Sequence, residues 1–160
     1  EVAYLGDDVE EAYLKALLSV GFDLPKKGVL LSTGTIESKV EFLEGARKLQ
    51  GLGLPLYATP KTHAFLSEND VQATLLHQPL SGDSPGVLEA LETGMIDLVI
   101  NVPRSLERKD LTSGYLIRRK AVDYGISLLT NIQAANLFCE ALWKIRDMEE
   151  LQVKPWSEYC

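Results

Sequence analysis

Two hydroxyls and a cation share one turn near the middle of the chain. The apolar run at 54–58 leads into Thr59, Lys61 and Thr62, and a helical pattern begins at 62. A helix amino terminus presents unpaired N–H groups and the positive end of the helix dipole, so these side chains would form a cradle for a phosphate or carboxylate. Two simpler interpretations stay open, in which Thr62 is only an N-cap and Lys61 is only a solvated cation.

Other candidate groups follow other apolar runs. Lys39 lies one turn into a helical pattern that begins at 36, where a bound anion would offset the unfavourable interaction of a cation with the helix dipole; a solvated Lys is the alternative. Asp83 could be a general base, but an Asp before Ser-Pro is also a common turn and helix-start signal. His63 and His77 could donate to an anion, yet neither has a Ser or Cys partner at motif spacing.

Several motifs of known chemistry are missing from the sequence. It contains neither Gly-x-Gly-x-x-Gly nor Gly-x-x-x-x-Gly-Lys-Ser/Thr, so no dinucleotide or nucleoside-triphosphate fingerprint is supported. Cys139 lies in an apolar helical pattern and Cys160 is the last residue, which indicates neither a metal site nor a disulfide. Of Arg118 and Arg119, at least one is expected to form a structural ion pair.

Short apolar runs alternate with helical patterns along the chain. A capping box at 8–11 opens a helix to about 20, and Asn131 is the expected N-cap of the final one. The runs lie at 28–32, 54–58, 71–76, 96–101 and 126–130, with helical patterns at 36–49, 62–69, 85–93, 115–124 and 132–145. Runs that are apolar throughout indicate strands covered on both faces. The predicted fold class is α/β, a doubly wound five-stranded parallel sheet with helices on both faces.

The polar loops of this predicted fold fall on one edge. Ligands of open parallel sheets bind beyond the carboxyl ends of the strands, where the strand order reverses. The loops at that edge carry hydroxyls, amides or Gly, whereas the opposite loops, such as 52–53 and 94–95, are short and plain. They lie at 32–35, 58–63, 77–84, 101–114 and 130–131. The polar edge is therefore the expected binding edge.

Composition limits the classes of function. The 160 residues carry a net charge of −7, with a pI of about 4.9, and suffice for one domain. The basic run at 118–120 is too short to outweigh that charge, so nucleic-acid binding is not expected. The sequence has no long apolar run and no basic-then-apolar start, so we expect neither a membrane span nor a signal peptide.

Several segments together resemble a known regulatory domain. They read GVLLSTGTIESK, LYATPKT, DLVINVP, YLIRRKAVDYGISLLTN and LFCEAL. In combination they resemble the carboxy-terminal, methylglyoxal-synthase-like allosteric domain of the carbamoyl-phosphate synthetase large subunit. The resemblance implies a helix and linker from the preceding synthetase region at 1–27, the allosteric domain at 28–146 and a tail at 147–160.

The related methylglyoxal synthase provides a comparison for activity. Its phosphate turn resembles 58–63 here, with both hydroxyls kept, and its catalytic Gly-Gly-Asp resembles the segment ending at Asp83. Its Trp-Asp-Pro, which supplies a second essential Asp, is replaced here by Asn101-Val102-Pro103, which contains no acid. The resemblance therefore implies binding with no catalytic residues. The alternatives are a free-standing lyase acting on dihydroxyacetone phosphate, with Asp83 as base, and a structural docking domain whose polar loops another chain covers.

Effector contacts carry over from the resembled family position by position. In relatives that bind UMP or IMP, the effector residues match Lys39, Thr59, Thr62, Gln78 and Asn101. In relatives activated by acetylglutamate, they match Thr59, Thr62, Gln78, Asn101 and Arg104. The weaker candidates, which do not carry over from the family, are Lys61, His77, Asp83 and Asn131. The chain departs from both branches at Gln78, where the first has a Lys and the second a Trp. It also departs at Arg104 and Gly114, where the second has Asn. The 101–114 loop is expected to order around the anion.

The resemblance also implies a larger parent enzyme. That parent is a glutamine-hydrolysing, ATP-dependent ligase that makes carbamoyl phosphate for pyrimidine and arginine synthesis. ATP and Mg would be cofactors of the parent, with no cofactor or metal in this domain. Its partners would be the remaining domains of the large subunit and the glutaminase subunit. The expected compartment is the cytoplasm, or the mitochondrion for the acetylglutamate branch.

Overall fold

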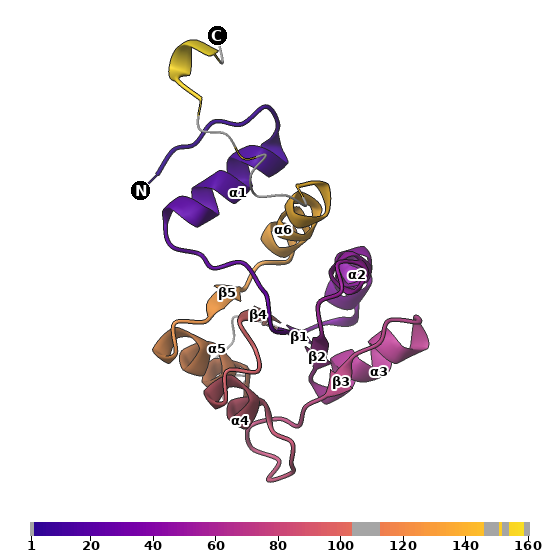
Figure 1. Ribbon diagram of the computed structural model, residues 1–160. Helices are drawn as coiled ribbons and strands as arrows, with labels where there is room; N and C mark the ends of the chain where they lie inside the picture. The colour runs from indigo at the N-terminus through magenta and orange to yellow at the C-terminus, as the bar shows by residue number, and fades with distance from the viewer. Residues whose placement is uncertain (1, 104–112, 146–150, 152–153, 159–160) are drawn as a thin grey trace.

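A parallel sheet lies at the centre of the computed structural model, which describes residues 2–103, 113–145, 151 and 154–158. Figure 1 shows helices on both sides of this sheet. In chain order the elements are α1 (Val9–Ser19), β1 (Val29–Thr33), α2 (Ile36–Gly51), β2 (Leu56–Ala58), α3 (Pro60–Glu68), β3 (Thr74–Leu75), α4 (Val87–Glu92), β4 (Leu98–Val102), α5 (Ser113–Asp123), β5 (Ser127–Leu129), α6 (Ile132–Lys144) and the 3-10 turn η3 (Trp156–Glu158).

The strand order fixes where a ligand site should lie. The five strands are ordered β3-β2-β1-β4-β5, and every neighbouring pair is parallel. From β1 the chain winds outward to β3 and then returns to the other side of β1 as β4. The order therefore reverses between β1 and β4, which confirms the doubly wound class and marks the crevice at their carboxyl ends.

Successive side chains along each strand pack alternately into two separate hydrophobic cores, one on each face of the sheet. Val29 and Leu31 of β1 point to one face of the sheet and Leu30 to the other, as the two-residue period of a strand requires. The first face packs against α2, α3 and α6, with α1 packed on α6, and the second face packs against α4 and α5. Both layers are visible in Figure 1. Burial on both faces explains why the strands are apolar throughout.

Several predicted boundaries and one helix face need correction. The helix expected from 62 begins at Pro60, and the strand expected at 71–76 is limited to Thr74–Leu75. In α2, Ile36 and Val40 are 56% and 60% exposed, although the spacing placed them on the buried face. The side chains that face the core are Lys39, Phe42, Ala46 and Leu49. The helix is therefore rotated so that Lys39 is buried and the predicted start of the buried face is exposed.

Helix α1 packs against α6, far away in the sequence. The Tyr13 hydroxyl donates to the carbonyl of Ala134 at 3.2 Å, and the rings of Phe22 and Phe138 meet edge to face at 5.3 Å. Asp8 is the N-cap of α1, as expected, and accepts from the N–H of Glu11 at 2.9 Å. The segment before β1 is thus joined to the same core as the sheet, through Leu14.

An ion pair between α1 and α6 should make stability depend on acid pH. Lys144 donates to the Asp8 carboxylate and, with the Glu11 N–H, lowers the pKa of Asp8 from 3.8 to about 2. Because the folded-state pKa is the lower one, the stabilisation is complete above the unfolded value and is lost as the pH falls from about 4 to about 2. Its size is at most about 1 kcal/mol, because the pair is largely exposed. Urea unfolding across this range should show a smaller loss for Asp8→Asn, which keeps the cap, than for the wild type or for Asp70→Asn. Equal losses in all three would contradict this assignment.

In the described part of the chain, no helix combines the length and the apolar character needed to cross a membrane.

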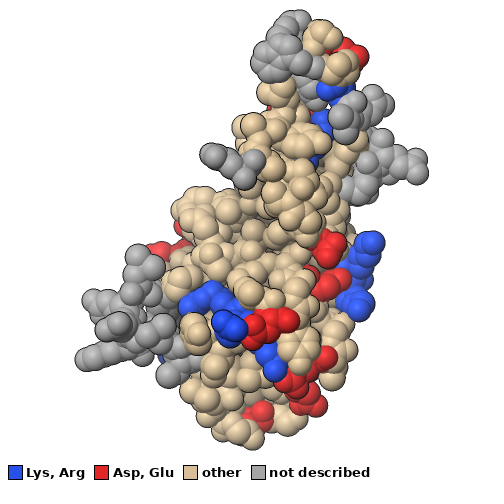
Figure 2. Space-filling view, turned by 90° about the vertical axis from the view of Figure 1, so that its left-hand side faces the viewer, with Lys and Arg blue, Asp and Glu red and all other residues tan. Residues whose placement is uncertain are grey.

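On the face shown in Figure 2, Lys and Arg side chains lie beside Asp and Glu side chains. Ion pairs such as Lys120–Glu92 and Arg119–Asp123 likewise join opposite charges of the described residues. The charges on this face are therefore mixed, and no single-sign patch dominates it.

Candidate anion-binding site

Buried polar side chains gather where the strand order reverses. Six polar or charged side chains are buried within the described residues, and Lys15, paired with Glu11 in α1, is the one away from this edge. The other five lie at the carboxyl ends of β1, β2 and β4 or in the first turns of the helices that follow: Thr33, Lys39, Thr59, Thr62 and Asn101. Burying polar groups costs free energy unless they are hydrogen-bonded, so their concentration at one edge needs an explanation.

Thr62 ties α3 to the end of β1. Its hydroxyl accepts from the N–H of Thr33 at 3.2 Å and lies 3.4 Å from both the hydroxyl and the carbonyl oxygen of Thr33. The interpretation of Thr62 as an N-cap is wrong, because α3 starts two residues earlier and its N-cap is Thr59. A hydroxyl has one hydrogen, and that of Thr62 is donated to the Thr33 carbonyl over 3.4 Å, so an anion bound here would have to take it from this long contact.

The amino terminus of α3 has no side-chain cap. Thr59 occupies the N-cap position without capping; its hydroxyl donates instead to Ser32 at 3.4 Å. Pro60 follows and has no N–H, which leaves the first-turn N–H groups of Lys61 and Thr62 without a side-chain acceptor. The start of α3 is therefore available to an external acceptor.

The amino terminus of the neighbouring helix α2, in contrast, is capped by a side chain. Thr35 accepts from the N–H of Ser38. The first-turn backbone N–H and then the Thr35 hydroxyl hold the pKa of Glu37 below its ordinary value. This end of α2 therefore already stabilises a carboxylate of the chain itself, as helix dipoles favour. The contrast leaves α3 as the open helix terminus of the pair.

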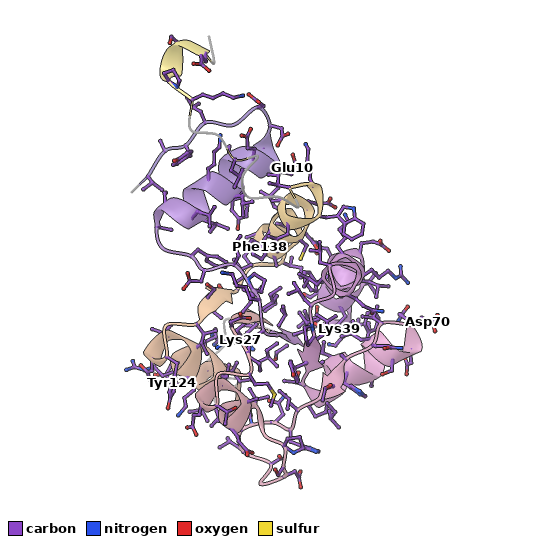
Figure 3. All side chains as sticks on the ribbon, viewed as in Figure 1. Glu10, Lys27, Lys39, Asp70, Tyr124 and Phe138 are labelled. Atoms are coloured by element: carbon purple, nitrogen blue, oxygen red, sulfur yellow. The ribbon has the colours of Figure 1, made fainter. Side chains whose placement is uncertain are left out.

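Lys39 brings a buried positive charge to this edge. It is 7% exposed, and its ammonium donates to the carbonyls of Gly34 at 2.9 Å and Thr35 at 3.4 Å. Figure 3 shows Lys39 in the interior beside the sheet, in contrast to Asp70 at the periphery. The solvated alternative is therefore wrong for Lys39. It holds for Lys61, which is exposed.

Asn101 lies opposite Ser32 in the β1–β4 ladder and is bound by an arginine. The Arg118 guanidinium donates through Nη1 to Asn101 Oδ1 at 2.6 Å. The sequence predicted an ion pair for at least one of the two arginines, and Arg119 forms it with Asp123 at 3.0 Å. Arg118 was missed as a site residue, although its position just after the 101–114 loop was a usable signal.

The remaining candidates either make no hydrogen bond within the described structure to the five buried polar side chains at this edge, here called the buried polar cluster, or lie outside the described residues. His77 Nδ1 lies 3.7 Å from Asp83 Oδ2 in the loop after the edge strand β3, and Asp83 is exposed. Asn131 caps α6 by accepting from the N–H of Ala134. Arg104 and positions 104–112 of the 101–114 loop lie outside the described residues.

Gln78 has an unusual environment. Its side-chain oxygen Oε1 is buried and has no hydrogen-bond partner in the described structure. An unpaired buried acceptor costs free energy, which favours a donor supplied from elsewhere. Gln78 forms no side-chain hydrogen bond with the buried polar cluster among the described residues, so its place in a site stays a prediction.

The described residues support neither a metal site nor a reactive thiol. They contain no group of three or more His, Cys, Asp or Glu arranged to hold a metal ion. The thiol of Cys139 is buried, and desolvation raises its pKa to about 12, so it is an unreactive core side chain at neutral pH.

Comparison with known proteins agrees with the predicted fold. The model of the MGS-like domain family matches residues 41–130, more than half of the chain. The chain is 41% identical over 157 residues to the multifunctional protein pyr-3 of Neurospora crassa, covering 93% of this chain and 9% of that protein. It is 40% identical over 164 residues to the mitochondrial carbamoyl-phosphate synthase [ammonia] of Rattus norvegicus, covering 99% and 11%.

A further relative follows the same pattern. The multifunctional protein URA2 of Saccharomyces cerevisiae is 39% identical over 151 residues, which cover 89% of this chain and 7% of that protein. The chain thus spans about a tenth of each of these relatives. The predicted resemblance to a region of carbamoyl-phosphate synthase proteins is confirmed, and the chain belongs to the family of MGS-like domains.

Proposed function

We propose that this chain is the allosteric effector-binding domain of a carbamoyl-phosphate synthase. It binds a small anionic effector at the carboxyl edge of the sheet, between β1 and β4. The observation that carries the proposal is the burial of Lys39 and Asn101 at that edge beside the uncapped start of α3. A cation, an amide and free N–H groups at the reversal of strand order form an environment suited to phosphate or carboxylate.

The effector class follows from the resemblance and from the donors. UMP, IMP and acetylglutamate all carry ionised phosphate or carboxylate groups that these donors can bind. Such an effector would act by binding one conformation of the parent more tightly than another, with a coupling of about 1 to 3 kcal/mol. The packing of α1 on α6 offers a connection from this domain to the segment before it.

The parent enzyme is part of the same proposal. It would use ATP and Mg to make carbamoyl phosphate for pyrimidine or arginine synthesis, with this domain joined to the rest of the large subunit and to a glutaminase. The named relatives support a role in such proteins, and one of them is mitochondrial by name. We place the parent in the cytoplasm, or in the mitochondrion if acetylglutamate is the effector.

Lyase activity on dihydroxyacetone phosphate receives less support. Asp83, the base it requires, is exposed on the loop after β3 and lies near His77. The segment that matches the second essential carboxylate, Asn101-Val102-Pro103, contains no acid. Two carboxylates that could share proton transfer are therefore not brought together.

A pair of substitutions at Thr62 tests the site. Calorimetry with UMP, IMP, UTP, ornithine, acetylglutamate and phosphoribosyl pyrophosphate identifies the ligand of the wild type. Thr62→Val, which removes the hydroxyl at constant shape, should weaken its binding by about 10-fold or more, because a hydrogen bond to a charged group contributes about 1.5 to 3 kcal/mol. Thr62→Ser keeps the hydroxyl and should retain most of the affinity. The proposal fails if no compound binds, or if Thr62→Val binds as tightly as the wild type.

A further inference from the structure

The contact between Arg118 and Asn101 determines which way the Asn101 amide faces. A guanidinium has only donors, so the atom that meets Arg118 Nη1 at 2.6 Å must be the amide oxygen. The amide nitrogen Nδ2 is therefore turned away from this contact. Asn101 is 2% exposed, and Nδ2 has no hydrogen-bond partner among the described residues. The buried amide thus has its acceptor used and its donors left for another group.

Gly114 provides the room for this arrangement. A Cβ at position 114 would lie 3.2 Å from Arg118 Nη1 and 3.7 Å from Asn101 Oδ1. The first distance is tighter than an ordinary van der Waals contact, so any side chain at 114 would press on the guanidinium. Glycine at the start of α5 therefore leaves the guanidinium in place, whereas a side chain at 114 would require it to shift by a few tenths of an ångström.

The polar groups available at this edge of the sheet are mostly hydrogen-bond donors. Lys39 offers an ammonium, Asn101 its Nδ2, and the start of α3 its uncapped N–H groups. Arg118 has further N–H groups and, among the described residues, no carboxylate partner. Because donors dominate, a ligand group that only accepts can satisfy them, whereas a neutral amide or ester would bring less charge and fewer acceptor positions.

We infer that Arg118 is a positioning residue that fixes the Asn101 amide as a donor and so makes the site selective for ionised phosphate or carboxylate groups. The inference rests on the proposed anion site and names a determinant of its selectivity. Arg118 acts through Asn101, and its effect should be visible in the amide of Asn101 even without a ligand.

The first measurement follows the Asn101 side-chain amide by NMR in the ligand-free protein. Replacing Arg118 with Met removes the guanidinium and should shift and broaden the Nδ2 signals, because the amide can then rotate. Arg119→Met is the matched control: Arg119 is the next residue of α5, and its partner Asp123 lies on the same helix. It should leave the Asn101 signals in place.

The second measurement titrates inorganic phosphate and, as a neutral comparison, trimethyl phosphate. The wild type should bind phosphate in preference to the ester. Arg118→Met should weaken phosphate binding by about 10-fold or more, with Arg119→Met unchanged. Asn101→Asp keeps a partner for Arg118 but replaces the donor with a negative charge, so it should fold normally and lose phosphate binding.

The outcomes separate this inference from the proposed function. If the wild type binds phosphate and Arg118→Met changes neither the Asn101 signals nor the affinity, the positioning role is wrong and the anion site stands. If neither phosphate nor any compound of the effector panel binds to the wild type, the anion site and its selectivity both fail. Tight binding of phosphate by Asn101→Asp would overturn the assignment of Asn101 as a donor.

Discussion

Replacing Lys39 with Met is expected to weaken effector binding by roughly 30-fold or more. Lys39 is 7% exposed, so an anion that meets its ammonium does so in a largely desolvated environment. Removing one partner of a buried, hydrogen-bonded charge pair costs about 2 to 5 kcal/mol, much of it because the other charge is left unpaired. Met keeps the length and apolar stem of the side chain, so the loss should come mainly from the charge.

Calorimetry with the identified effector measures this loss, and Arg47→Met is its control. Arg47 lies two turns further along α2, and its exposed guanidinium pairs with Glu44, so its replacement should leave binding unchanged. Thermal unfolding of Lys39→Met checks that the turn at Gly34 stays folded without the ammonium contact at 2.9 Å. If a folded Lys39→Met variant binds the effector as well as the wild type, Lys39 has only a structural role.

Replacing Phe138 with Ala is expected to reduce the free energy of unfolding by about 3 to 5 kcal/mol. Phe138 is fully buried on the inner side of α6 (Figure 3), and its ring meets that of Phe22 at 5.3 Å. Truncation removes apolar burial, leaves a cavity and deletes the contact between the two rings. A loss of this size is a large fraction of the stability of an ordinary domain.

Urea unfolding of Phe138→Ala gives the magnitude, with Tyr115→Ala as the control. Tyr115 is an aromatic residue of α5 that is 46% exposed, so its truncation should change stability by no more than about 0.5 kcal/mol. A change below about 1 kcal/mol for Phe138→Ala would mean that α6 does not anchor this core. Because Phe138 lies outside the buried polar cluster, any Phe138→Ala protein that remains folded should still bind the effector.

The alternation of strands and helices could be predicted from local sequence patterns. Each apolar run between turn residues became a strand, and each helical pattern became a helix, because backbone propensity and side-chain period act over a few residues. Asp8 and Asn131 were likewise identified as caps from spacing alone, and both caps are present. The short strands β3 and β5 show the limit, because neighbouring strands decide how many residues of an apolar run pair.

The polar edge was also predicted from the sequence, but the role of each side chain at that edge was not. Lys39 and Lys61 looked alike as cations near helix starts, yet one is buried and the other exposed. The difference depends on how each helix is rotated against the sheet. For α2 the pattern predicted a buried face that begins with Ile36 and Val40, whereas packing buries the face that includes Lys39.

By itself, the sequence determined the doubly wound class, the edge that carries the polar loops and the family resemblance, because these depend on periodicity and on the order of segments. The tertiary structure alone decided that Thr62 pairs with Thr33 of β1 and that Arg118 reaches Asn101. Those contacts join residues of different elements. They exist only after the strands take their places in the sheet and the helices dock in one rotation, which no local pattern specifies.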